Sequence, residues 1–379
     1  MMNKMTMDKR VRFKSTPKKS EFIKVLRQRV DAYFTDNNIS PYANTEMVLK
    51  TIFAIVAWTA TYTWIMSDTL GIFGLFMVFL LLGFVNIFIA FNIMHDATHD
   101  AYSSKQWIND ALGYSMNFIG GNQYLFRRMH GAHHGYVNIH GIDVTLETHG
   151  LFRFTPDEPY LPHHKWQHIY TPILYSFAML QWVTAKDFKW FFVESSIGNN
   201  KGIKHPLREY VILLISKTVY YGLTLVLPII FLSVPAWVVI LAWINMHILP
   251  GLTFALIFQV THIYEGTHFP HPDDHGNIDN NYALHVLETT ADFSRKKRLG
   301  SWLMGGINIH VIHHIFPKVC HVHYDKLTDI LKETAEEFGI DYHENPNFWV
   351  ALKKHMWMLH HLSKPDATVP EYGKSAYIV

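Results

Sequence analysis

Three short groups of histidines are the residues of this sequence best suited to chemistry. They are HDATH from His95, HGAHH from His130 and HVIHH from His310. Their eight members are His95, His99, His130, His133, His134, His310, His313 and His314. On a helix, residues three or four positions apart share one face, so each group can direct its imidazoles toward one point. The spacing predicts a metal site.

The number of histidines predicts two metal ions. A divalent ion accepts about four to six ligands, so eight imidazoles exceed the needs of one ion. The sequence holds 26 histidines in 379 residues, and one HxxHH motif can arise by chance. Two such motifs and an HxxxH, each beside an apolar segment, favour a metal-binding site over chance clustering. Imidazole suits iron, zinc, copper or nickel, and the residues alone do not choose among them.

Other metal and nucleotide sites lack their motifs. There is no HExxH, and the one ExxH, from Glu265 to His268, has no partner of the kind that carboxylate di-iron bundles use. Cys320 is the single cysteine, so a thiolate pair is excluded. No glycine-rich nucleotide loop is present. A net charge of +2 gives no sign of a nucleic-acid partner, and the basic residues from Lys4 to Arg29 suit anionic lipid headgroups.

Long uncharged stretches indicate an all-α membrane protein. Residues 69–94 and 218–264 carry no charge, and the second stretch would be roughly 70 Å long as a helix, twice the thickness of a bilayer core. We expect four spans in two hairpins, near residues 48–67, 69–93, 211–232 and 235–259. A helical cap built from residues 94–210 and 260–379 would carry the two-metal site. We further expect a basic segment at 1–47 and one domain at 48–379.

Residues 169–185 form a fifth apolar stretch. If it crossed the membrane, the third histidine group would face the opposite side from the first two, and no shared site could form. Tyr170, Pro172, Tyr175 and Trp182 instead suit an interfacial helix. Lys50 and Lys217 lie near span ends and are expected to extend toward headgroups.

The distribution of basic residues predicts the orientation. The first 30 residues carry ten Lys and Arg, whereas the two hairpin turns carry none. Both termini and all three histidine groups should therefore be cytosolic. We expect an integral, multi-pass protein, in a bacterial inner or plasma membrane by preference and in the endoplasmic reticulum if the source is eukaryotic.

The histidine groups and their surroundings resemble the membrane fatty acid desaturases. In that family HxxxH follows the second span, HxxHH comes about thirty residues later and a second HxxHH follows the fourth span, as here. The similarity extends to HDATHDAYS, FQVTHIYEGTHFP, HVLETTADF and WLMGGINIHVIHHIFPKVCHVHY, and covers nearly the whole chain after Thr51. It is greatest to the linoleoyl-CoA or front-end branch. Two departures are His310, where that branch often has Gln, and the absence of the HPGG motif of a fused cytochrome b5 domain.

The resemblance implies a definite reaction. Two iron ions would use O2 as co-substrate to remove two hydrogens from a methylene pair of a fatty acyl-CoA or acyl-lipid. Electrons would come from a separate donor, ferredoxin or cytochrome b5 with its reductase. Such oxidation needs a cofactor, because no ordinary side chain supplies the oxidant.

The resemblance also implies a ninth histidine ligand, for which His262 is the first choice and His285 the second. Neighbouring groups would support the site. Asp96, Asp100 and Glu265 could orient ligands, with a plain surface role equally open for Asp100. Gly305 and Gly306 would allow a close backbone approach to the metals or the acyl chain. Five further histidines are expected to be exposed or interfacial, namely His163, His164, His168, His360 and His361.

Two other functions stay open at this point. A hydroxylase, ketolase or acetylenase could use the same scaffold, since the oxidant is shared and the outcome depends on how the substrate lies. A metal transporter is the alternative from another class. Its ligands would lie inside the spans near the membrane midplane, whereas the eight grouped histidines lie outside the expected spans.

Overall fold

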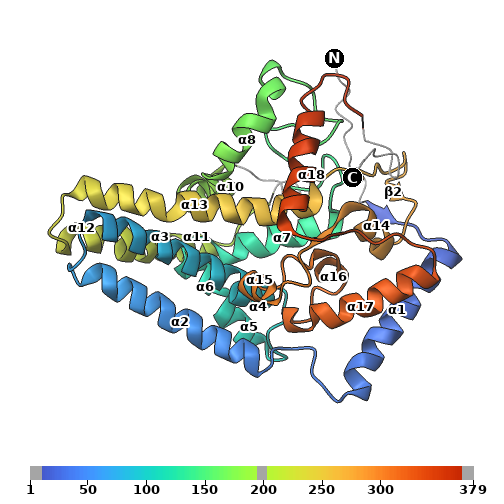
Figure 1. The fold of residues 1–379 in the computed structure, drawn as a ribbon, viewed down its shortest axis with the longest axis horizontal. Coiled ribbons are helices and arrows are strands. Elements are labelled where there is room, and N and C mark those ends of the chain that lie inside the picture. The colour runs from blue at the N-terminus through green and yellow to red at the C-terminus, as the bar shows by residue number, and fades with distance from the viewer. Residues whose placement is uncertain (1–10, 194–202, 369–379) are drawn as a thin grey trace.

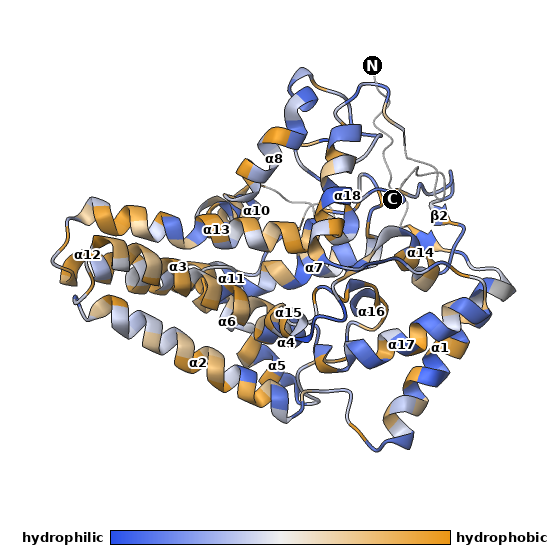
Figure 2. Cartoon of the chain, in the orientation of Figure 1, coloured by the Kyte–Doolittle hydropathy of each residue, from blue (hydrophilic) through white to orange (hydrophobic). Residues whose placement is uncertain are grey.

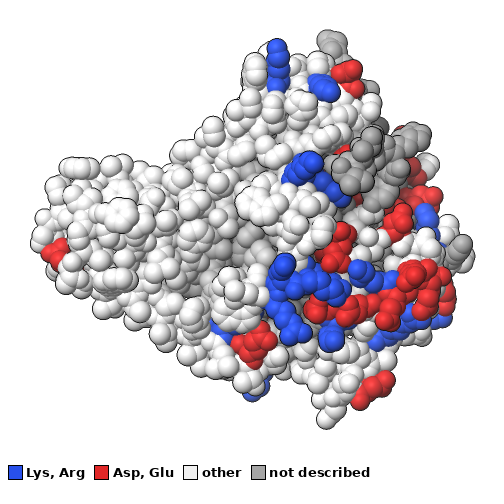
Figure 3. Space-filling model, in the orientation of Figure 1, with Lys and Arg blue, Asp and Glu red and all other residues white. Residues whose placement is uncertain are grey.

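The computed structural model describes residues 11–193 and 203–368. This part of the chain is mostly helical and has very little strand, with a bundle of long helices at one end and a cap of shorter helices at the other (Figure 1). Hydrophobic residues dominate the long helices, and hydrophilic residues are concentrated in the cap (Figure 2). On the face drawn in Figure 3, charged side chains gather over the cap and leave the bundle nearly bare.

Four long helices carry the apolar stretches. They are α2 (Thr45–Met66); α3 (Ile72–Ile89), continued by the π-helical η1 (Ala90–Met94) and by α4 (His95–Thr98); α11 (Leu207–Tyr221), continued by the π-helical η4 (Gly222–Val226) and by α12 (Leu227–Phe231); and α13 (Ala236–His262). Each is long and apolar enough to cross a membrane, and no other described helix is. The four expected spans are confirmed. The second and fourth extend farther than predicted, to Thr98 and His262, and so carry histidines of the candidate site at their ends.

The two hairpins pack against each other through α3 and α13. A Cβ on Gly83 of α3 would lie 2.0 Å from the carbonyl oxygen of Met246 in α13, so only glycine allows this approach. At the far end the hairpin turns are joined, because Asp68 accepts a hydrogen bond of 2.9 Å from the backbone N–H of Ser233. Many large apolar side chains on the outside of the bundle are exposed, such as Phe73 at 78%, as expected of a surface that faces lipid.

Residues 169–185 do not form a continuous helix. They are divided among α8 (Gln167–Tyr175), α9 (Ala178–Gln181) and the start of the π-helical η3 (Trp182–Lys186). A Cβ on Gly251 of α13 would lie 2.6 Å from the carbonyl oxygen of Ser176, so the break between α8 and α9 lies directly on α13. This stretch is not among the described helices that could span a membrane.

Lys50 and Lys217 are buried, so the expectation that they extend toward headgroups is wrong. The Lys50 ammonium donates to the Asn92 side chain at 3.0 Å and to the carbonyl oxygen of Trp302 at 3.2 Å. The Lys217 ammonium lies 2.8 Å from Asp187. A charge inside a bundle needs such partners, because its desolvation costs several kcal/mol. Each lysine thereby connects a spanning helix to the cap.

The cap consists of short helices from both polar stretches. The first stretch forms α5 (Gln106–Gly113), α6 (Ser115–Phe118), α7 (Gln123–Tyr136), the 3-10 helix η2 (Pro162–Trp166), α8, α9, η3 and α10 (Asp187–Phe192). The second forms α14 (Tyr282–Thr289), α15 (Arg298–Leu303), α16 (His310–Ile315), the 3-10 helix η5 (His321–His323), α17 (Tyr324–Glu337) and α18 (Phe348–His361). Figure 1 shows α4, α7 and α16 close together where the cap meets the bundle.

The amino-terminal helix α1 (Pro17–Asp36) shares a hydrophobic core with α17. Phe22 and Leu26 of α1 and Leu331 of α17 are fully buried in it. Arg29 also pairs with Glu337 at 2.7 Å. Two short parallel pairs join distant segments. They are β1 (Arg12–Phe13) with β2 (Asn277–Ile278), and β3 (Asp292–Phe293) with β4 (Glu344–Asn345).

Candidate metal centre

The three histidine groups come from three elements that meet under the cap. His95 begins α4 and His99 caps its end, so the first group is the continuation of a spanning helix. The second group lies on the last turns of α7, whose start is capped by Asn122. The third group forms α16, which begins at His310. The structure therefore brings together all eight histidines that the sequence singled out.

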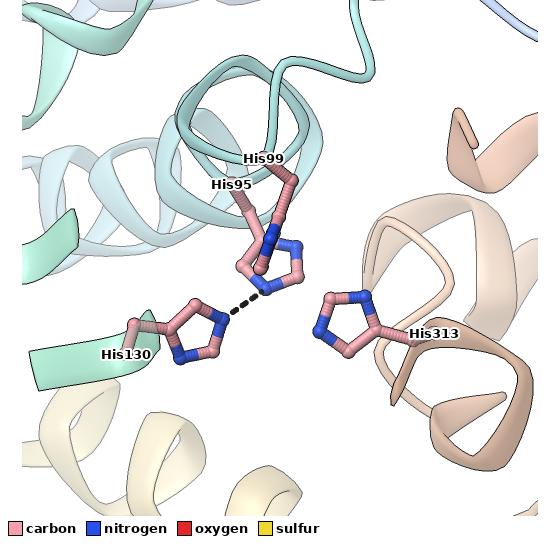
Figure 4. Close-up of side chains that lie close together, drawn as sticks. All are labelled: His95, His99, His130 and His313. Atoms are coloured by element: carbon pink, nitrogen blue, oxygen red, sulfur yellow. Dashed lines mark hydrogen bonds between the residues drawn. The ribbon is translucent and has the colours of Figure 1, made fainter. Parts of the chain in front are cut away.

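One set of four imidazoles is formed by His95, His99, His130 and His313 (Figure 4). One nitrogen from each ring lies within 4.8 Å of those of the other three. Nε2 of His95 and Nε2 of His130 are 3.0 Å apart. Figure 4 shows the rings converging from three sides on one position. We call this set the first tetrad.

A second tetrad is formed by His133, His262, His310 and His314, again with one nitrogen from each within 4.8 Å of the others. All four side chains are buried. Nε2 of His133 lies 3.2 Å from Nε2 of His262, which ends α13. His262, the first choice from sequence for a ninth histidine, is thus a member of this tetrad.

His134 lies between the two tetrads. Its Nε2 is 3.1 Å from Nε2 of His130 in the first tetrad. Its ring stacks on that of His314 in the second, with centroids 4.1 Å apart. The nine histidines therefore form one continuous cluster with two four-nitrogen positions.

The expectation that each group points its imidazoles at one position is wrong for the second and third groups. His130 belongs to the first tetrad and His133 to the second, while His313 belongs to the first and His314 to the second. Successive residues of a helix are about 100° apart around its axis, so the neighbours His313 and His314 diverge. Each of these two helices thereby serves both positions.

The chemistry of the tetrads fits metal ions. Burial and the neighbouring imidazoles lower the pKa of His130, His134, His310, His313 and His314 well below the usual value, so these rings are neutral at pH 7. Neutral imidazole is the form that binds metal. Buried ring nitrogens of His99, His310, His313 and His314 have no protein hydrogen-bond partner. Unpaired polar atoms in such a place are costly unless they have a ligand.

Two side chains that sequence reasoning missed hold imidazoles of the cluster. Nδ1 of His133 lies 3.0 Å from both carboxylate oxygens of Asp143. Burial alone would raise the Asp143 pKa, but the adjacent His133 and two backbone N–H groups lower it below the usual value. The hydroxyl of Tyr324 lies 3.0 Å from Nδ1 of His313. The sequence offered little indication of Asp143, which lies in a loop nine residues beyond the second histidine group.

The three acids chosen from sequence lie in different surroundings. Asp96 is buried and accepts hydrogen bonds from His321 at 2.8 Å and from the Cys320 thiol at 3.0 Å, so it joins the first group to the segment after the third. Asp100 pairs with Arg127 on the surface. Glu265 is buried.

Gly305 and Gly306 allow close approaches between segments of the protein. A Cβ on Gly305 would lie 2.3 Å from the carbonyl oxygen of Phe91 in η1. A Cβ on Gly306 would lie 2.9 Å from Cβ of His321. Both glycines have positive φ, which other residues rarely adopt. They allow the loop before α16 to pack against the helix that carries the first group.

Two other histidines differ from the sequence-based assignments. His285, the second choice for a ninth histidine, lies outside both tetrads, and its Nε2 donates to the carbonyl oxygen of Val137 at 2.8 Å. His164, expected to be exposed or interfacial, is buried and lies 2.9 Å from the carbonyl oxygen of Gly150. Both bind backbone carbonyl groups through Nε2 and lie outside the two tetrads.

An apolar cavity of about 40 Å³ adjoins the first tetrad. Its lining includes His95, with Phe91 and Met94 of η1 and Phe254 and Phe258 of α13. An apolar chain entering this cavity would meet the metal centre at His95. The site thus combines neutral imidazoles of the kind that binds metal with an apolar cavity.

Known proteins provide an independent comparison. The family model described as fatty acid desaturase matches residues 70–346. The chain is 32% identical over 359 residues to sn-1 linoleoyl-lipid 6-desaturase of Synechocystis, covering 92% of this chain and 97% of that protein. It is 33% identical over 333 residues to the protein of the same name from Arthrospira platensis, covering 87% of this chain and 89% of that protein. It is 30% identical over 355 residues to acyl-lipid (8-3)-desaturase of Physcomitrium patens, covering 92% and 72%.

These matches confirm the family and branch expected from the histidine groups, and with them an oxidoreductase that desaturates fatty acyl chains. They do not favour a hydroxylase or a metal transporter. The chain belongs to the fatty acid desaturase family.

Proposed function

We propose that this protein desaturates the acyl chain of a membrane lipid at a centre of two iron ions, with O2 as co-substrate. The observation that carries the proposal is the pair of histidine tetrads, each with four nitrogens within 4.8 Å of one another. The first tetrad would hold one ion and the second the other, with His134 between them. Iron bound there would supply the oxidant that an unactivated methylene pair requires.

The chain's own residues would prepare the site for this reaction. The buried cluster keeps imidazoles neutral and ready to bind. Asp143 and Tyr324 hold two rings by their second nitrogen, which directs the first nitrogen at the metal. The apolar cavity beside His95 would orient the acyl chain and exclude water from it.

A lipid-linked acyl chain is the substrate class that we favour over acyl-CoA. The relatives with the names linoleoyl-lipid and acyl-lipid desaturase are similar over most of this chain. The cavity is lined both by spanning helices, through residues such as Ile87 and Phe254, and by the cap, through residues such as Phe126. A chain attached to a bilayer lipid could therefore reach it without leaving the membrane.

We further propose that residues 48–379 form one catalytic domain preceded by a basic segment at 1–47, and that both termini and the active site face the cytosol. The location would be a bacterial inner or plasma membrane, or the endoplasmic reticulum in a eukaryote. Electrons would come from a separate carrier, ferredoxin or cytochrome b5 with its reductase.

The activity is tested by expressing the protein in a host of known lipid composition and profiling the fatty acids of each lipid class. We expect a new product lighter than its precursor by two hydrogens, which appears first in intact lipids. His95→Ala should abolish it, whereas His275→Ala, at an exposed loop histidine, should not. A product that has gained oxygen would identify a hydroxylase, and a product that appears first in acyl-CoA would reject the lipid-linked substrate.

The orientation is tested by cysteine labelling. The native Cys320 is buried, so it gives little background. Lys165→Cys, at an exposed position of η2, should react only from the cytosolic side, and Thr69→Cys, at the exposed first hairpin turn, only from the other side. The reverse pattern would overturn the orientation.

The carrier is tested with purified protein and lipid substrate. Turnover should require reduced ferredoxin, or cytochrome b5 with its reductase, in addition to O2. Equal turnover with a chemical reductant and O2 but no carrier would contradict this part of the proposal.

A further inference from the structure

One aromatic side chain of the cavity, Trp182, is held by a buried network. Trp182 lies in η3, a π-helical turn, a form that is frequent at functional sites. The cavity measures about 40 Å³, which is room for about three water-sized spheres. In so narrow a space a single large side chain decides what fits.

Trp182 is connected to the metal centre through aromatic contacts. Phe126 stacks on the imidazole of His130, with centroids 4.8 Å apart. The ring centroid of Trp182 lies 6.0 Å from that of Phe126 and 5.8 Å from that of Phe254 in α13. Phe126, Trp182 and Phe254 together form one wall of the cavity that begins beside the first tetrad.

The indole is fixed by Asp187. Its N–H donates to one carboxylate oxygen of Asp187 at 3.1 Å. The other oxygen of Asp187 lies 2.8 Å from the ammonium of Lys217. Asp187 and Lys217 are both nearly inaccessible, at 2% and 4% exposure.

Lys217 also holds the backbone of the same wall. Its ammonium donates to the carbonyl oxygen of Gly120 at 2.6 Å and to that of Val183 at 2.9 Å. Val183 and Gly121, the neighbour of Gly120, both line the cavity. One lysine on the spanning helix α11 thus positions two separate segments of cavity wall.

An ion pair in this place is expensive. Ionisable residues inside a membrane-spanning helix are rare and mark functional sites, and a buried pair is often no more stable than an apolar replacement. Stability alone therefore gives a poor account of Asp187 and Lys217. A fixed orientation of the indole over the cavity gives a better one.

We propose that Trp182 limits how far an acyl chain extends past His95, and so selects the chain length that is desaturated. Asp187 and Lys217 are positioning residues that keep the indole in place. This inference rests on the proposed function, and it adds the residue that sets substrate length.

The test compares wild type with Trp182→Ala, which removes the ring, and Trp182→Phe, which keeps a ring but loses the N–H to Asp187. Trp166→Ala is the control, since Trp166 is 56% exposed and lies outside the cavity. Host cells receive linoleic acid with one shorter and one longer homologue. The readout is the ratio of converted longer chain to converted linoleoyl chain, together with the amount of folded protein.

Trp182→Ala should raise this ratio about tenfold, the scale at which a hydrophobic pocket discriminates by a methylene group or two. Trp182→Phe should raise it less, and Trp166→Ala should leave it unchanged. Should Trp182→Ala not fold, the Phe variant carries the test. Ratios equal to wild type in the folded Trp182 variants would overturn the inference alone, whereas a wild type that converts no acyl chain would overturn the proposed function and the inference with it.

Discussion

The carboxylate of Asp143 accepts a hydrogen bond of 3.0 Å from Nδ1 of His133, while Nε2 of the same ring lies 3.2 Å from Nε2 of His262. Asp143 is 2% exposed and also accepts from the backbone N–H groups of Asn138 and Thr145 at 2.9 Å. The loop thus fixes the carboxylate, and the carboxylate fixes the ring. His133 is left with Nε2 facing the second tetrad.

Asp143→Asn should lower activity and iron affinity by about 10- to 100-fold, because groups that orient a ligating imidazole have effects of this size. The iron lost should be the ion of the second tetrad. Asp100→Asn is the matched control, since Asp100 is partly exposed and pairs with Arg127 away from both tetrads. Iron content and turnover are measured on purified protein. Asp143→Asn with wild-type values for both would contradict the assigned role.

Variants of His310 test what a histidine does at a position where this branch often has Gln. It belongs to the second tetrad with His314, one helical turn away. His310→Ala should be inactive and lose about one of two irons, because the tetrad loses a nitrogen. His310→Gln should keep much of the activity and of the iron content, since the amide oxygen can still reach the ion. A shifted double-bond position with unchanged iron content in the Gln variant would instead assign His310 to placing the acyl chain.

Gly305→Ala should prevent correct folding. The new Cβ would lie 2.3 Å from the carbonyl oxygen of Phe91, and the φ of +57° would cost about 1–3 kcal/mol in addition. Gly300→Ala is the control, because the nearest atom to its Cβ would be 3.5 Å away. The yield of monodisperse protein and its thermal midpoint are measured in detergent. A Gly305→Ala protein as stable as Gly300→Ala would show that the loop can move away from η1.

The metal-free protein should lose stability in acid. Burial lowers the pKa of His285 and of His355 to about 4, whereas unfolded histidines titrate near 6.5. Between these pH values the unfolded chain therefore binds more protons than the folded protein. The contribution of these histidines to the free energy of unfolding is complete above about pH 6.5 and is lost as the pH falls to about 4. Thermal midpoints across this range measure it, and His285→Gln should reduce the slope. A midpoint that does not change between about pH 7 and 5 would be the contrary result.

Much of the architecture could be predicted because local signals carry it. Uncharged apolar stretches indicated the four helices, and the i, i+3, i+4 spacing indicated the eight histidines. Residues 169–185 could be excluded as a span, because a fifth crossing would place the third histidine group on the opposite side of the membrane from the first two. Signals of this kind depend only on neighbours in sequence.

What could not be predicted depends on contacts between distant segments. The sequence cannot tell that His130 and His133, which share a helix face, serve different tetrads, because this depends on where α4 and α13 lie. Asp143 lies in a loop without a motif, and its contact with His133 follows from the fold of that loop. Lys50 looked free to reach headgroups, yet Asn92 and Trp302 bind it in the interior.

We infer that nine histidines hold two irons, which desaturate a lipid-linked acyl chain. The decisive measurement is iron per chain in purified active protein, taken alongside product formation. Wild type should hold about two irons, and His133→Ala and His95→Ala should each hold about one and form no product. An active preparation with one zinc per chain and no iron would contradict the account.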